Sequence, residues 1–116
     1  MKSVRIYHNP RCSKSRQALS LLESGGVNPD IVEYLKQAPD FNELDNILKM
    51  LGIEPRELMR RHEKAYQENN LDDAALTRED LINAMIENPI LIERPIVIKG
   101  GHAIIGRPPE KVLELL

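Results

Sequence analysis

The clearest signal for the fold is VRIYHNPRCSKSRQALSLLESGG, residues 4–26. Val4 to Tyr7 alternates apolar and polar residues among β-forming side chains, which predicts a strand that ends at the Asn9-Pro10 pair. Apolar residues then recur at helical spacing until Gly25-Gly26, a pair typical of a helix C-terminus. Strand, turn and helix therefore follow one another, and Cys12 lies where the helix starts.

The rest of the sequence completes an α/β pattern. A second strand is predicted over Ile31 to Leu35, and the resulting βαβ unit implies a right-handed parallel pair. Residues 96–99 and 103–105 predict a hairpin around Gly100-Gly101, followed by a final helix within Pro108 to Leu116. This order of a βαβ half and a ββα half predicts an α/β protein with a thioredoxin-like fold, in which helices flank a central mixed β-sheet.

Between the two halves the pattern is helical, which predicts an all-helical insertion at about 38–88. Asp40 is expected to cap a helix that ends at Gly52, and Pro55 to begin a short helix. The apolar residues of segment 60–74 have no regular spacing, which predicts a loop or a broken helix. A capping signal then predicts a helix from Thr77 to Asn88. Because no linker or repeat separates the segments, a single domain over 1–116 is predicted.

Composition narrows the possible functions. The chain has 116 residues and a formal net charge of −2, so it lacks the charge excess typical of nucleic-acid-binding proteins. Its apolar runs are too short to span a bilayer, and the N-terminus lacks the apolar core of a signal peptide. No cysteine and histidine residues have zinc-site spacing. We therefore expect a cytoplasmic protein that binds no metal, no nucleic acid and no membrane.

Cys12 is the single cysteine of the chain. A thiol reacts as its thiolate, and the thiol pKa falls at helix N-termini and beside cations. Both conditions are met, because the first 22 residues contain five Lys and Arg residues and no acidic residue. The sequence therefore predicts a reactive thiol and not a buried structural cysteine. Since no second cysteine can close a disulfide, any thiol chemistry must recruit a thiol from outside the chain.

Two polar neighbours of Cys12 each allow two interpretations. His8, at the end of the first strand, is either a charge partner of the thiol or a solvated end residue. Ser15 stands where a CxxC pair has its second cysteine. Its hydroxyl can donate a hydrogen bond to the thiolate, or it can bond backbone N–H groups of the first helical turn. In either case Ser15 cannot form a disulfide, so the chemistry is monothiol.

Four segments, HNPRCSKSR, RR at 60–61, ERPIVI and GRPPE, together resemble the glutaredoxin-coupled arsenate reductases of the ArsC family over essentially the whole chain. The resemblance implies a thioredoxin-like fold with a helical insertion. The family motif N-P-x-C-x-x-S-R matches Asn9, Pro10, Cys12, Ser15 and Arg16. By this resemblance Cys12 is the catalytic nucleophile, and the residues that stabilise its thiolate are His8, Ser15 and Arg16.

The resemblance also implies an oxyanion site formed by Arg60, Arg94 and Arg107. Guanidinium groups suit a tetrahedral oxyanion, because they donate hydrogen bonds in a planar fork and stay charged. Composition alone makes Arg61 as good a candidate as Arg60. The Arg94-Pro95 bond is a candidate cis peptide. In thioredoxin-like folds a cis-proline lies beside the active-site cysteine, so Pro95 is expected to place Arg94 at the thiol.

The activity implied by the resemblance is reduction of arsenate to arsenite through a covalent Cys12-arsenic intermediate. Glutathione is then the co-substrate, glutaredoxin the protein partner, and no cofactor is bound. Two alternatives remain open. One is a redox-sensing or regulatory protein of the Spx type, although those regulators carry a CxxC switch that Ser15 breaks here. The other is a monothiol oxidoreductase with a different substrate.

Overall fold

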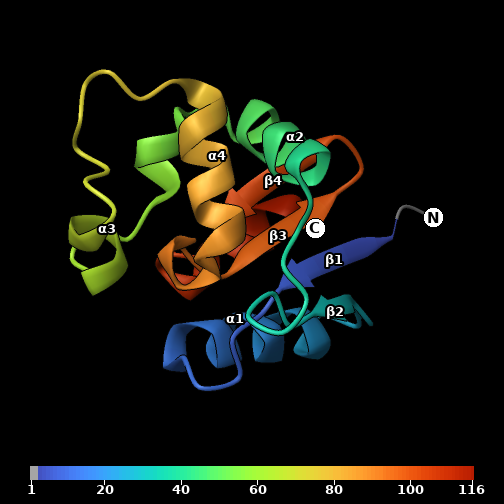
Figure 1. Ribbon diagram of the computed structural model, residues 1–116. Coiled ribbons are helices and arrows are strands. Elements are labelled where there is room, and N and C mark those ends of the chain that lie inside the picture. Colours follow the sequence, from blue (N-terminus) through green and yellow to red (C-terminus); the bar gives the residue numbers. More distant parts are fainter. Residues whose placement is uncertain (1–2) are drawn as a thin grey trace. The chain divides into compact units, whose positions relative to one another are not determined.

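The strand predicted at the start of the chain lies inside a four-stranded sheet (Figure 1). In the computed structural model, which describes residues 3–116, β1 (Val4–Tyr7) pairs in parallel with β2 (Asp30–Val32) and antiparallel with β3 (Ile96–Lys99). β3 pairs antiparallel with β4 (His102–Ile105), which gives the strand order β2-β1-β3-β4. The predicted mixed sheet is confirmed.

One face of the sheet packs against α1 (Ser13–Ser24) and η3 (Pro109–Leu115), and Figure 1 shows α1 running along it. Side chains alternate along a strand, so every second residue of β1 points toward this face. Buried apolar side chains of β1, α1, β3 and η3 meet there: Val4, Ile6, Ala18, Leu22, Val97 and Val112. This core fixes α1 against the sheet and thereby positions the loop that carries Cys12.

Two predicted elements differ from the structure in length or type. β2 ends at Val32 and not at Leu35, because its partner β1 extends only to Tyr7. A last hydrogen bond from the His8 N–H to the Val32 carbonyl, 2.8 Å long, closes the pairing, and the chain then turns at Glu33. The final predicted helix is a short 3-10 helix, η3.

The chain divides into two units. The residues up to Gln37 and from Arg94 onward form the sheet-containing unit, and Ala38–Glu93 forms the second, which extends past the end predicted for the insertion. The second unit consists of α2 (Phe41–Leu51), η1 (Pro55–Leu58), α3 (Lys64–Glu68), α4 (Arg78–Glu87) and η2 (Pro89–Leu91). None of the helices in residues 3–116 has the length and apolar character needed to cross a membrane.

The predicted helix ends of the second unit are confirmed. Asp40 caps α2, because its Oδ1 accepts the Glu43 N–H at 2.9 Å, and Gly52 ends that helix with a left-handed φ of 67°. Thr77 and Asp80 form a capping box at the start of α4, with hydrogen bonds of 3.1 and 2.9 Å. Such caps satisfy backbone groups that have no partner inside the helix, and each contributes about 1 kcal/mol.

Gly106, just after β4, has the side chains of Pro95 and Val112 packed close to its backbone. A Cβ at this position would meet Pro95 Cγ at 2.8 Å and Val112 Cγ1 at 3.0 Å. We therefore expect Gly106→Ala to lower the free energy of unfolding by about 1–3 kcal/mol, measured by urea denaturation. The control is Gly101→Ala, whose Cβ would meet nothing within 4 Å. Equal effects of the two substitutions would contradict this packing.

Candidate active site

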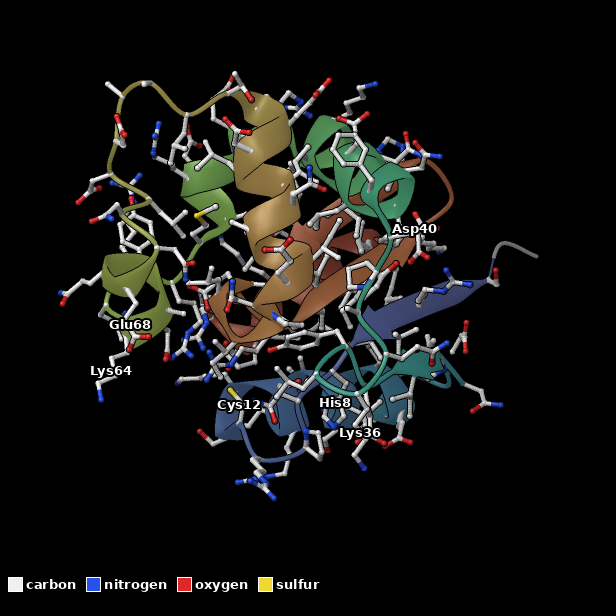
Figure 2. The ribbon with its side chains drawn as sticks, viewed as in Figure 1. His8, Cys12, Lys36, Asp40, Lys64 and Glu68 are labelled. Carbon is white, nitrogen blue, oxygen red and sulfur yellow. The ribbon has the colours of Figure 1, made fainter. Side chains whose placement is uncertain are left out.

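Cys12 is the N-cap residue of α1 and ends the loop that leaves β1 (Figure 2). Its N–H donates to the Asn9 carbonyl at 3.0 Å, and its own carbonyl accepts the Arg16 N–H at 3.0 Å, the first bond of the helix. The Asn9 side chain braces the same loop, because its Oδ1 accepts the Arg11 N–H at 3.0 Å. The thiol is therefore held at a helix N-terminus, where backbone N–H groups favour a negative charge.

A buried hydrogen-bond network joins His8 to Ser15. The Nδ1 atom of His8 lies 2.6 Å from the Ser15 hydroxyl oxygen, and that oxygen also accepts the Asn9 N–H at 3.1 Å. Burial lowers the pKa of His8 and the Arg16 charge lowers it further, although Glu33 opposes them. The direction of the His8–Ser15 hydrogen bond follows from which ring nitrogen of His8 carries the proton. Both side chains thus fix the loop, and their predicted effect on the thiolate stays a prediction.

Two of the predicted oxyanion-binding residues, Arg94 and Arg107, lie at the thiol. The Arg94-Pro95 bond is cis, as the sequence suggested, and the Pro95 carbonyl accepts the Gly106 N–H at 2.9 Å. The Arg107 Nε donates to the Arg94 carbonyl at 2.9 Å, and its Nη2 lies 3.9 Å from the Cys12 sulfur. β3 and β4 thereby bring two guanidinium groups to the start of α1.

The pKa of the Cys12 thiol is lowered from its ordinary value. Burial of the sulfur is the largest single influence and raises this pKa, but it is outweighed by groups that stabilise the thiolate. The Ser15 N–H comes first, followed by the hydrogen bond and charge of Arg94 and by the Lys14 N–H. The ionised thiol is therefore favoured by the first turn of α1 and by a guanidinium group from the β3 side of the sheet.

The other predicted arginines have contacts of their own. Arg16 donates from Nη1 to the Pro10 carbonyl at 2.9 Å and so supports the loop. Arg60 belongs to the second unit, where its guanidinium group pairs with Glu63 and lies 3.9 Å from a carboxylate oxygen of Glu93. Only 13% of the Arg60 side chain is exposed. Its predicted part in oxyanion binding stays a prediction.

Sequence reasoning missed two links in this site. It expected Ser15 to bond the thiolate or the backbone, whereas the structure also pairs it with His8. It also gave no indication that the Arg107 side chain would bond the Arg94 carbonyl, since Arg94 precedes β3 and Arg107 follows β4. Within the described residues 3–116, no group of three or more His, Cys, Asp or Glu residues could hold a metal ion.

The effect of Arg94 on the thiol can be measured directly. Arg94→Gln removes a positive charge and a hydrogen bond that lower the Cys12 pKa, so that pKa should rise. The thiolate fraction near neutral pH then falls, and alkylation by iodoacetamide slows. Thiolate absorbance against pH reports the pKa itself. The control is Lys111→Gln, an exposed cation that is not among the groups acting on the Cys12 pKa, and an equal rise in both variants would contradict the assignment.

Comparison with known proteins adds independent evidence. Residues 7–115 match the model of the ArsC family. The chain is 55% identical over 116 residues to the uncharacterized protein YfgD of Escherichia coli strain K12, covering 99% of this chain and 98% of that protein. It is 52% identical over 115 residues to an arsenate reductase of Haemophilus influenzae, covering 98% of this chain and 99% of the relative.

A solved structure confirms the fold class. The arsenate reductase from Vibrio cholerae aligns with a TM-score of 0.96 and 51% identity, covering 99% of this chain and 98% of that one. The resemblance inferred from the sequence and the thioredoxin-like α/β fold that it implied are thus both confirmed. The chain belongs to the ArsC family.

Proposed function

We propose that this protein reduces arsenate to arsenite, with Cys12 as the nucleophile and with glutathione and glutaredoxin as external reductants. The observation that carries the proposal is a thiol of lowered pKa that lies at a helix N-terminus beside Arg94 and Arg107. Support also comes from relatives named arsenate reductase, which are 52% identical in Haemophilus influenzae and 39% identical in Escherichia coli.

In the first step the Cys12 thiolate attacks the arsenic atom of bound arsenate. A sulfur–arsenic bond forms, one arsenic–oxygen bond breaks, and the departing oxygen leaves as water after protonation. Arsenic stays in the +5 state. Arg94 and Arg107 donate hydrogen bonds to the remaining oxygens and balance their charge. The N–H groups of the first turn of α1 further stabilise this negative charge. A part for Arg60 in oxyanion binding is proposed from the family resemblance alone, since Arg60 belongs to the second unit.

In the second step a glutathione thiolate attacks the Cys12 sulfur. A sulfur–sulfur bond forms and the sulfur–arsenic bond breaks, leaving its electron pair on arsenic, which departs as arsenite in the +3 state. The two sulfur atoms lose two electrons as the mixed disulfide forms, and arsenic gains these two electrons. Glutaredoxin thiolate then attacks the glutathione sulfur, and Cys12 leaves as a thiolate. All electrons come from thiols, so the proposal requires no bound cofactor.

The remaining site residues shape the reaction without changing bonds. Asn9 and Pro10 hold the loop through backbone and side-chain hydrogen bonds, and Pro95 ties the Arg94 segment to the residue before Arg107. These contacts keep the sulfur and the guanidinium groups in one arrangement before arsenate arrives. Such preorganisation matters, because donors that must reorient during the reaction stabilise the transition state less.

A coupled assay tests this function. Arsenate, glutathione, glutaredoxin, glutathione reductase and NADPH are mixed with the protein, and NADPH oxidation is followed. We expect arsenate-dependent turnover that Cys12→Ser reduces to the enzyme-free rate, because a hydroxyl cannot form the mixed disulfide. The control is Ser20→Ala, on the exposed side of α1, which should retain the wild-type rate.

Two results would overturn the function. One is wild-type NADPH oxidation no faster than the enzyme-free blank, which would favour a regulatory protein or another substrate. The other is undiminished turnover by Cys12→Ser. Circular dichroism of each variant establishes that the fold is retained.

A further inference from the structure

A cavity of about 290 Å³ lies beside the loop that leads to Cys12. One wall is the loop from His8 to Arg11, and the opposite wall is formed by Glu33, Leu35 and Lys36, which follow β2. All of these residues belong to the sheet-containing unit. Figure 2 shows His8 and Lys36 next to each other at this place. The steps proposed above leave the cavity and its charged residues without a role.

The charges around the cavity have a definite pattern. Arg11 and Lys36 bring two cations, and Glu33 brings one carboxylate, which lies 3.6 Å from the Lys36 ammonium group. The Lys36 side chain is 81% exposed and the Glu33 side chain 43%, so both can exchange this weak pairing for a ligand. Pro10 and Leu35 add apolar surface. The lining therefore matches a small molecule with two carboxylates, one ammonium group and an apolar stem.

The loop that forms one cavity wall is also joined to Cys12 through the backbone. Arg11 directly precedes Cys12 in the chain, and the carbonyl of Asn9, another wall residue, accepts the Cys12 N–H at 3.0 Å. A tripeptide spans at most roughly 10 Å when extended, and a cavity of this volume lies near the lower end of small-molecule sites. A short peptide bound by its ends could thus bring a central side chain past the loop toward Cys12.

We propose that this cavity binds the thiol co-substrate as a small zwitterionic peptide of the glutathione type. Arg11 and Lys36 hold its two carboxylates, Glu33 holds its ammonium group, and its central cysteine faces the arsenic-bearing Cys12 sulfur. The inference rests on the proposed function, since only a thiol that attacks the Cys12 adduct needs this position. The bonds that form and break are those of the second step above.

Charge reversal at the cavity rim tests the proposal. Lys36→Glu should raise KM for glutathione in arsenate reduction by about threefold to tenfold, because it replaces an attraction for a carboxylate by a repulsion. The rate with 2-mercaptoethanol, which has no charged group, should stay unchanged. The matched control is Lys111→Glu, an exposed residue of the same unit outside the cavity, which should leave both parameters unchanged.

A binding measurement separates this inference from the proposed activity. S-methylglutathione cannot react, and its titration into the wild-type protein without arsenate should shift amide signals of 8–11 and 33–36 in nuclear magnetic resonance spectra. Lys36→Glu should weaken this binding by a similar factor. An unchanged KM in Lys36→Glu, or signal shifts confined to other residues, would overturn the cavity assignment. Absence of turnover with every thiol, despite intact binding, would instead overturn the arsenate reductase function.

Discussion

The first turn of α1 stabilises a negative charge on Cys12 against the cost of burying it, and the other parts of the site depend on this contact. The Ser15 and Lys14 N–H groups supply the helix contribution, and Arg94 supplies a full charge. The turn holds its place because the core between α1 and the sheet fixes the helix. β3 and β4 then place Arg94 and Arg107 at the sulfur. Thiol reactivity is therefore a property of the fold around the sheet.

Features set by neighbouring residues could be predicted from the sequence, and features set by distant partners could not. The strand Val4–Tyr7, the Asp40 cap and the capping box at Thr77 each depend on local patterns. The end of β2 depends on the length of β1, which its own residues do not encode. Likewise, the β-forming residues after Ile31 predict a strand longer than β2, but residues beyond Val32 have no partner in β1.

The site shows the same division. The cluster of cations around a lone cysteine at a helix start was visible in the sequence, and so was the candidate cis bond before Pro95. The hydrogen bond between His8 and Ser15 requires the strand and the helix to be folded together, and burial then lowers the histidine pKa. The contacts of Arg60 with Glu63 and Glu93 also form only in the folded second unit. Residue type alone could not distinguish an anion-binding arginine from one paired with carboxylates.

The central proposal is that the single thiol passes through a glutathione mixed disulfide that forms as arsenate is reduced. The most direct test is the intact mass of the protein after anaerobic incubation with arsenate and reduced glutathione, with glutaredoxin omitted. The account predicts a mass increase of one glutathione, located on Cys12 by peptide mapping and absent without arsenate. Reduced glutathione alone supplies no oxidant for this bond. An unmodified Cys12 after arsenate treatment, or an adduct that forms equally without arsenate, would contradict the account.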